Sequence, residues 1–168
     1  MSSSRQLLGV HSCTIDPEGR IQLPTALRDE LNLRAADFRL MANLEPDGSL
    51  CLREKEDWDA WTATLNTRPV ATQRERRTLL FLAAHASAVR CDKTGRIRIP
   101  DPLLKAAGVD RADPKRREVV LVGGFTEVRV WSPEGWERFG ATVLEDFGPG
   151  LDALLGGSSA GASEEEVG

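Results

Sequence analysis

Two short stretches of this chain share one pattern of apolar and polar positions. Residues 92–100 read D-K-T-G-R-I-R-I-P, and residues 16–24 read D-P-E-G-R-I-Q-L-P. In both stretches apolar residues alternate with polar ones, which is the pattern of a strand with one buried face. In residues 92–100 the two isoleucines are therefore expected to point inward, while Arg96 and Arg98 point outward.

Each stretch also carries the signature of a tight turn before its predicted strand. In a D-x-x-G turn the aspartate can accept backbone N–H groups, and the glycine tolerates a positive φ. The turn residues are Asp16 and Gly19 in the first copy and Asp92 and Gly95 in the second. A proline, which has no N–H to donate to a ladder, then ends each strand, and apolar residues four apart predict a short helix after it.

The match continues beyond the two phrases. When they are superposed, Leu27 aligns with Leu103 and, farther along the chain, Trp58 aligns with Trp136. The sequence is therefore interpreted as an internal duplication of a unit of about 50 residues.

Each copy is predicted to continue into a β-hairpin and then an amphipathic helix. Apolar runs at 38–44 and 49–53 flank the turn residues E-P-D-G, and the runs at 118–125 and 127–131 correspond to them. The helices place large apolar residues on one face, namely Trp58, Trp61 and Leu65 in the first copy and Trp136, Phe139 and Val143 in the second. These tryptophans could stack on nucleic-acid bases, but their helical spacing favours packing in the core or at a subunit interface.

Between the copies, the stretch T-Q-R-E-R-R-T-L-L-F-L-A-A-H-A predicts a helix that begins basic and becomes apolar. We interpret it as a connector packed on the core, with a solvated first turn. The expected organisation is a first unit at 11–56, a helical connector at 57–87, a second unit at 88–134, a C-terminal helix at 135–155 and a disordered Gly/Ser/Glu tail at 156–168.

Charge changes this picture only locally. The formal net charge of -4 argues at first against nucleic acid as a partner. Three of the acidic residues, however, lie in the predicted tail at 164–166, and the stretch from Arg68 to Arg90 holds five arginines against the single acidic residue Glu75. A basic patch is therefore compatible with the composition.

Little in the sequence supports catalysis, a cofactor or a metal site. Cys13, Cys51 and Cys91 lack C-x-x-C spacing and are interpreted as buried free thiols, and His11 and His85 are isolated from each other. The chain has no nucleophile elbow and no phosphate-binding loop. The absence of these motifs predicts that the protein is not an enzyme. The chain has neither an apolar run long enough to span a membrane nor a secretory signal, so a cytoplasmic location is expected.

The ordered set of turn, alternating strand, proline and short helix resembles the AbrB-like, swapped-hairpin DNA-binding domains. Two such units, joined by a basic-to-apolar helix and each followed by a tryptophan-bearing helix, resemble the MraZ family of bacterial transcriptional regulators over residues 9–147. The most specific pieces are D-K-T-G-R-I-R-I-P, L-L-F-L-A-A-H-A-S-A and V-V-L-V-G-G-F-T-E-V-R-V-W. The resemblance implies an α+β fold class, with a duplicated swapped-hairpin β-barrel that is pseudo-twofold within one chain and has flanking helices.

The same resemblance implies a function and a set of site residues. It implies a ring-shaped homo-oligomer that binds double-stranded DNA at direct repeats upstream of its own division and cell-wall gene cluster, and hence a nucleoid-associated regulator. Carried over to this sequence, the DNA-facing residues are Arg20, Lys93 and Arg96. Arg98 is added to this set because its strand position points outward.

Two departures from the family pattern qualify these expectations. Pro17 and Glu18 lie in the first turn, where a basic residue before the glycine is usual, so weaker DNA binding by the first copy is expected. Residues 110–118, D-R-A-D-P-K-R-R-E, form a longer connection than expected. They could add a phosphate contact or form a solvated insert, and the second interpretation is favoured.

The alternative class is a protein–protein module of antitoxin type, which sequesters a partner protein through an appended tail. Residues 148–168 could form such an arm. After Leu155, however, only Val167 could anchor to a partner, whereas recognition segments usually offer several apolar residues. The composition of the tail therefore favours DNA binding over this alternative.

Overall fold

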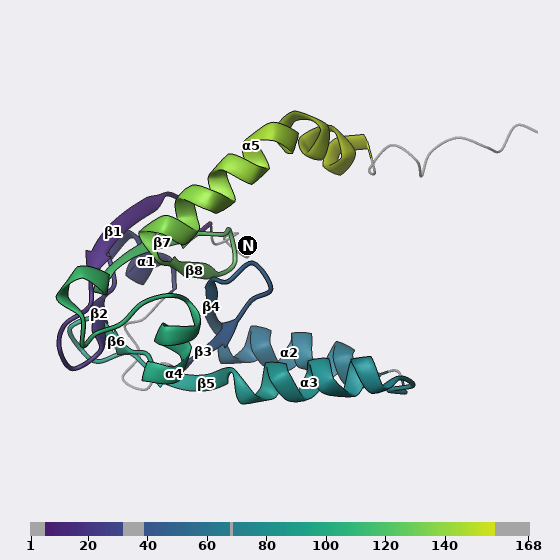
Figure 1. Ribbon diagram of the computed structural model, residues 1–168, viewed down its shortest axis with the longest axis horizontal. Helices are drawn as coiled ribbons and strands as arrows, with labels where there is room; N and C mark the ends of the chain where they lie inside the picture. Colours follow the sequence, from purple (N-terminus) through teal and green to yellow (C-terminus); the bar gives the residue numbers. More distant parts are fainter. Residues whose placement is uncertain (1–5, 32–38, 68, 157–168) are drawn as a thin grey trace, which may run out of the picture.

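Two antiparallel sheets organise the part of the chain that the computed structural model describes, residues 6–31, 39–67 and 69–156 (Figure 1). The larger sheet has the strand order β1 (Val10–Thr14), β7 (Glu118–Gly123), β8 (Val128–Trp131), β4 (Leu50–Glu54), β3 (Arg39–Leu44) and β5 (Ala86–Arg90). The smaller sheet pairs β2 (Arg20–Gln22) with β6 (Arg96–Arg98). The expected hairpins, β3–β4 and β7–β8, are both confirmed.

The duplication seen in the sequence is repeated in the strand pairing. β1 of the first copy pairs with β7 of the second, and β5 of the second copy pairs with β3 of the first. At the centre of the sheet, β4 pairs with its counterpart β8, so that Leu52 lies opposite Val128 and Leu50 lies opposite Val130. The sheet order therefore reads the same from both ends, which gives the chain an internal pseudo-twofold relation.

The hydrogen-bonded ladders among the described residues do not close into the expected barrel. The six-stranded sheet is open, and β2 and β6 form a sheet of their own. Each of these two strands has three residues and is followed closely by a proline, Pro24 or Pro100, which has no N–H to extend a ladder. Because the prolines stop their ladders early, the two short strands pair with each other. They contribute to the fold mainly by burying their isoleucine side chains.

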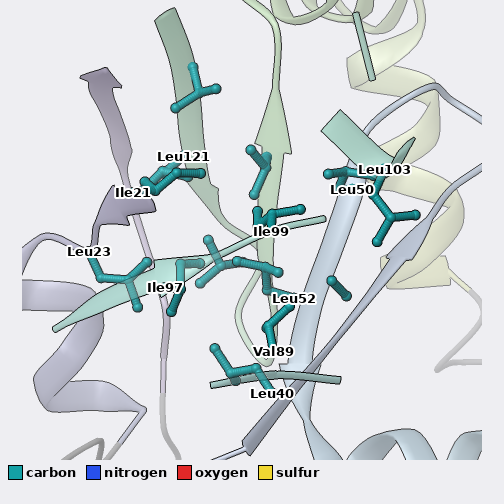
Figure 2. Close-up of a cluster of buried hydrophobic side chains, with 14 of the residues drawn as sticks. Ile21, Leu23, Leu40, Leu50, Leu52, Val89, Ile97, Ile99, Leu103 and Leu121 are labelled. Carbon is teal, nitrogen blue, oxygen red and sulfur yellow. The ribbon is translucent and has the colours of Figure 1, made fainter. Parts of the chain in front are cut away.

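One apolar core lies between the two sheets (Figure 2). Ile21 and Ile97 of the small sheet are fully buried, and Leu40, Leu52 and Leu121 of the large sheet are equally inaccessible. The predicted alternation is confirmed, because Ile97 and Ile99 are buried while Arg98 is exposed. Both copies supply this core, so neither can bury its apolar residues alone.

Short helices follow the two prolines as predicted. These are α1 (Thr25–Glu30) and α4 (Asp101–Ala106), which bury Leu27 and Leu103 in the shared core. A left-handed glycine, Gly108 at φ +80°, follows α4. Beyond it, residues 110–117 form a compact segment that contains the short 3-10 helix η1 (Pro114–Arg116).

Three longer helices extend away from the sheets as two arms (Figure 1). One arm contains α2 (Lys55–Asn66) and α3 (Gln73–Ala84), and the other is α5 (Pro133–Gly156). The small sheet lies at the opposite end of the molecule from the arms (Figure 1). No described helix is both long and apolar enough to cross a membrane.

The expectation that the connector helix packs on the core was wrong. No residue of α3 is buried, and the side chains of Leu80 and Phe81 are 72% and 58% exposed. The core is filled by strands and short helices from both copies, and α3 extends from it in an arm beside α2 (Figure 1). His85 is not within this helix but is its C-cap residue. The predicted tail at 156–168 lies outside the described residues, apart from Gly156 at the end of α5.

Replacing Ile97 by alanine should lower the free energy of unfolding by about 2–5 kcal/mol, because it removes buried methyl groups from the core that both copies share. Urea unfolding followed by tryptophan fluorescence at a fixed protein concentration measures this change. The control is Arg98→Ala in the same strand, which should change stability by less than about 0.5 kcal/mol. Equal losses for the two variants would contradict the inward position of Ile97.

Candidate nucleic-acid interface

The outer face of the small sheet gathers arginines from both copies. In the antiparallel register, Arg20 lies opposite Arg98, Gln22 lies opposite Arg96, and Ile21 lies opposite Ile97. Directly opposed residues share one face of an antiparallel pair, and the face that carries the isoleucines is buried in the core. The other face, called the arginine face below, therefore carries Arg20, Gln22, Arg96 and Arg98.

The first loop, residues 16–20, is held together by Asp16. Its Oδ1 accepts the backbone N–H groups of Glu18 at 3.0 Å and Arg20 at 2.8 Å, and its Oδ2 accepts the Nε of Arg20 at 2.7 Å. The N–H of Gly19 donates to the Asp16 carbonyl at 2.9 Å, with Gly19 at φ +82°. The carboxylate thus fixes both the turn and the arginine that follows it.

The second loop, residues 92–96, repeats this geometry around Asp92. The Oδ1 of Asp92 accepts the backbone N–H groups of Thr94 at 2.8 Å and Arg96 at 3.0 Å, and also the Thr94 hydroxyl at 2.6 Å. The Nε of Arg96 donates to Oδ2 at 3.0 Å, and Gly95 lies at φ +83°. The hydroxyl of Thr94 is an additional donor that the first loop lacks, because Glu18 is at the equivalent position.

These contacts keep both carboxyl groups ionised. The Thr94 hydroxyl, followed by the N–H of Arg96, holds the pKa of Asp92 well below its usual range. Desolvation acts to raise the pKa of Asp16, but its hydrogen bonds with Arg20 and Glu18 outweigh this effect, so that the pKa of Asp16 is also lowered. Each loop therefore carries a fixed negative charge beside its arginine.

The two loop arginines differ in how much of their donor capacity the protein uses. Arg20 donates through Nε to Asp16 and through Nη2 to Glu18, at 3.2 Å. Arg96 donates through Nε to Asp92, and both of its terminal nitrogens lack a partner among the residues that the structure describes. Arg96 therefore has more free donors than Arg20 for an external ligand.

Lys93 and Arg98 complete the set of cations that the sequence singled out. Both side chains are exposed, and within the described ranges neither forms an ion pair. Lys93 lies at the tip of the second loop, and Arg98 lies at the end of β6, opposite Arg20. The structure thus brings Arg20, Arg96 and Arg98 onto one face, with Lys93 beside them on the second loop.

Sequence reasoning missed two arginines that contact the loops. Arg28 of α1 donates through Nη1 to the Thr94 carbonyl at 3.0 Å, and Arg111 donates through Nη1 to the Pro17 carbonyl at 2.7 Å. Arg28 lies on a helix whose sequence carries no signal for this contact. Arg111 lies in the segment 110–118, but its partner is 94 residues away in the chain, so that only the fold reveals the contact.

The tryptophans contact other residues of the arms and sheets rather than lining the arginine face. The ring centroids of Trp58 and Trp61 are 5.3 Å apart, and the guanidinium of Arg53 lies 4.8 Å from the ring centroid of Trp61. Trp131 and Trp136 form a second pair at 6.0 Å. These contacts favour a packing role over base stacking.

Among the described residues, neither a metal-binding cluster nor an activated thiol accompanies the arginine face. These residues contain no group of three or more His, Cys, Asp or Glu residues that could hold a metal ion. Burial, the largest cause, raises the pKa of the Cys51 thiol to about 12, which leaves it protonated and unsuited to act as a nucleophile. The basic start of α3 lies at the far end of an arm, away from the small sheet (Figure 1). An array of fixed, solvent-facing cations is suited to a polyanion.

Comparison with known proteins finds the same family model twice in this chain. The model for the MraZ protein, which is also described as antitoxin-like, matches residues 7–81 and again residues 82–148. The two matches confirm the internal duplication, and together they cover most of the chain.

Individual relatives carry the same name. The transcriptional regulator MraZ of Thermoanaerobacter sp. is 33% identical over 151 residues, which are 88% of this chain and 98% of the relative. Its namesake in Thioalkalivibrio sulfidiphilus is 31% identical over 130 residues, 77% of this chain and 82% of the relative. That of Cutibacterium acnes is 32% identical over 140 residues, 83% of this chain and 91% of the relative. These relatives are named as regulators and not as enzymes.

Replacing Thr94 by valine should raise the pKa of Asp92 toward its usual range, because it removes the hydroxyl that does most to lower it while preserving the shape of the side chain. A carboxyl carbon NMR titration measures this pKa. The matched control is Thr78→Val, which removes a hydroxyl that bonds to the Arg74 carbonyl in α3. An unchanged pKa of Asp92 in Thr94→Val would show that the hydroxyl does not hold this carboxylate.

The lowered pKa of Asp92 also predicts the sign of a pH effect on stability. A carboxyl group whose pKa is lower in the folded chain stabilises the fold above its unfolded pKa of about 3.9 and loses this contribution as the pH falls. The stability advantage of the parent chain over Thr94→Val should therefore be larger at neutral pH than in acid. Urea unfolding at several pH values measures it, and an advantage that grows in acid would contradict the assignment.

Proposed function

The chain belongs to the MraZ family, and on that premise we propose that it is a DNA-binding transcriptional regulator whose arginine face contacts double-stranded DNA. The observation that carries this proposal is the pairing of β2 with β6, which sets Arg20, Arg96 and Arg98 side by side on a solvent-facing surface. Exposed arginines on short, hydrogen-bonded turns suit DNA, because a guanidinium can bind a phosphate or the O6 and N7 of guanine.

The two loops are proposed to divide this work unequally. Asp16 and Asp92 hold the turns and bind the Nε atoms, which orients each guanidinium with its terminal nitrogens outward. The second loop and its strand carry Lys93, Arg96 and Arg98 against one aspartate, whereas the first carries Arg20 against two carboxylates. Attraction to phosphate and counterion release should therefore arise mainly from the second copy.

A single arginine face is too small to bind an operator tightly, so we further propose that several copies act together. A ring of subunits would present many loops at fixed spacing, and each bound loop would raise the effective concentration of the next. Direct repeats upstream of the chain's own division and cell-wall gene cluster would match such an array. A regulator of this kind would be found on the nucleoid.

The helical arms support self-association. By the internal duplication α5 is the counterpart of α2, and Val143 corresponds to Leu65. In the first copy, a groove at Leu65 is flanked by α3, which contributes Leu79. The equivalent groove on α5 is lined by Val143, Phe147 and Leu151, and among the described residues it has no helix of this chain beside it.

We propose that a helix from a second copy covers this face of α5. The apolar residues of the face lie on successive turns and are well exposed, with Phe147 at 58% and Leu151 at 44%. A contact between α5 of one copy and a different surface of the next is heterologous, and such contacts close into rings when the rotation permits. The arms would thus form the subunit contacts, leaving the arginine faces free for DNA.

The antitoxin-like description of the family model supports one second candidate, a module that sequesters a partner protein. A gel shift separates the two functions. The full chain should bind the DNA upstream of its own gene in the presence of a scrambled competitor at moderate salt. Failure to bind any upstream fragment specifically would favour the protein–protein module.

Arg96→Ala should weaken operator binding more than Arg20→Ala, because Arg96 has more free donors and a more positive surrounding loop. A bidentate contact with guanine is worth about 1–3 kcal/mol, or about tenfold or more in affinity. Binding is measured by fluorescence anisotropy, with Arg76→Ala on the distant arm as the charge-matched control. Thermal melting is recorded in parallel, since either arginine also braces its turn. A larger loss in Arg20→Ala would contradict the proposed order.

Glu18→Lys should strengthen DNA binding and steepen its salt dependence, because it replaces the carboxylate that holds the Nη2 of Arg20 with a cation. The slope of log affinity against log salt concentration measures the change. Glu145→Lys on α5 adds the same charge away from the loops and serves as the control. The proposed position of the first loop against DNA would be wrong if Glu145→Lys matched Glu18→Lys in both affinity and slope.

Phe147→Asp should reduce the size of the oligomer, because it places a carboxylate on the apolar face of α5 that the second copy is proposed to cover. Light scattering should give a mass well above 18.4 kDa for the parent chain and a smaller mass for the variant. Ala141→Asp adds the same charge on the opposite side of α5 and should leave the oligomer intact. A parent mass of one chain would remove the ring from the proposal.

A further inference from the structure

In each of the two loops, an arginine from the opposite copy donates a hydrogen bond to a backbone carbonyl and packs against the glycine of the turn. This pair of contacts is called a brace. Arg28 reaches from α1 of the first copy to the second loop, where its Nη1 bonds to the Thr94 carbonyl. The side chain of Arg28 also lies directly against Gly95, because a Cβ at that glycine would collide with the Cδ of Arg28. The brace therefore fixes a carbonyl and closes over the glycine of the turn.

Arg111 makes the corresponding contacts with the first loop. Its Nη1 bonds to the Pro17 carbonyl at 2.7 Å, and a Cβ at Gly19 would lie 3.4 Å from its Cδ. Pro17 precedes the glycine by two residues, whereas Thr94 in the second loop precedes Gly95 by one. The two braces are therefore alike in chemistry and position but differ by one residue in the carbonyl they hold.

The two arginines come from positions that the duplication does not relate. The residue of α4 that aligns with Arg28 is Leu104, which is buried in the core at 1% exposure and cannot reach the loop. Arg111 lies beyond α4, in the segment 110–117 of the connection to β7, which is longer than the connection between α1 and β3 in the first copy. The second copy thus lacks an arginine on its short helix and supplies one from this segment.

Segment 110–117 is itself ordered by hydrogen bonds. The N–H of Asp110 donates to the Arg116 carbonyl at 3.0 Å, and the Nε of Arg117 donates to the Arg111 carbonyl at 2.6 Å. The Arg117 carbonyl accepts the N–H of Ile15 at 2.8 Å, immediately before the first loop. A solvated insert would not need these contacts, so the favoured sequence-based interpretation of this segment is incomplete.

The start of each short helix anchors its arginine, but with different charge. Arg28 donates through Nη2 to the Thr25 hydroxyl at 3.1 Å. Arg111 binds Asp101 at the equivalent helix position, with Nε 2.6 Å from Oδ1 and Nη2 2.8 Å from Oδ2. The charge of Arg111 is therefore paired with a carboxylate, whereas Arg28 is anchored by a neutral hydroxyl.

We propose that Arg111 is a positioning residue for the first loop, and that segment 110–117 supplies in the second copy the brace that Arg28 supplies in the first. The inference rests on the proposed DNA-binding function. Arg111 acts by holding the Pro17 carbonyl, so that Arg20 extends from a fixed turn. Because Asp101 pairs its charge, its effect on DNA binding is geometric and not electrostatic.

Hydrogen exchange of the loop amides tests the brace without DNA. In Arg111→Gln, the Gly19 amide should exchange about tenfold faster, as expected when a hydrogen bond from a charged group is lost, while the Gly95 amide is unchanged. Arg28→Gln should show the reverse pattern. Lys115→Gln removes a charge from the same segment without a contact to either loop, and should alter neither amide. Equal exchange in the parent chain and Arg111→Gln, or acceleration in both loops alike, would overturn the brace.

Binding to two DNAs tests the consequence for recognition. Arg111→Gln should lower affinity for the upstream fragment by several-fold more than Lys115→Gln does, while both variants bind unrelated DNA of the same length equally, because unrelated DNA responds mainly to charge. Arg111→Lys keeps the charge but not the paired geometry, and should lose affinity for the upstream fragment as Arg111→Gln does. Full rescue by lysine, or equal losses on both DNAs, would show that Arg111 acts through charge and overturn the proposal.

The two experiments distinguish failure of this inference from failure of the proposed function. If the parent chain binds no DNA specifically, the DNA-binding function is wrong, and the exchange pattern still decides whether Arg111 braces the first loop. If the parent chain binds and Arg111→Gln differs from Lys115→Gln in neither experiment, the function stands and the positioning role of Arg111 is wrong.

Discussion

The antiparallel pairing of β2 with β6 is the constraint on which the rest of the structure depends. Each strand has only three residues, and neither could remain ordered alone. Pairing places Ile21 opposite Ile97 on the core side, where both are fully buried. With a period of two, burying the isoleucines forces the flanking arginines to the solvent side. The same pairing that completes the core therefore creates the arginine face, and it requires both copies of the duplicated unit.

The charged groups of this face are useful only because the loops restrain them. Asp16 and Asp92 each bind backbone N–H groups and the Nε of the arginine four residues later, so that one carboxylate sets the turn and the side-chain direction together. This restraint of the arginines lowers the net positive charge of the arginine face, since each aspartate offsets the charge of one arginine. Small differences around this shared frame, with Glu18 in one loop and Thr94 in the other, make the two copies electrostatically unequal.

Most of the large apolar residues that the core does not bury lie on the arms. The sheets and short helices close around a core that both copies fill, and the longer helices extend from it on the side away from the small sheet (Figure 1). The result is a spatial separation, with charged loops at one end and apolar helical surfaces at the other. An assembly built through the arms would leave the loops accessible, as the proposed binding to repeated DNA sites requires.

Local rules acting on the sequence determined the turns, the alternating strands, the hairpins and the short helices after the prolines, because each depends on residues within a few positions of one another. The sequence also showed the duplication, and with it the MraZ family. Only the tertiary structure decided that the strands form an open sheet beside a separate pair, that α3 leaves the core, and that Arg28 and Arg111 cross between copies to brace the loops. The first two features depend on which apolar surfaces of the chain are buried together in one core. The third depends on contacts between residues far apart in the chain, such as that of Arg111 with Pro17. The spacing of residues along the chain carries no signal for either kind of feature.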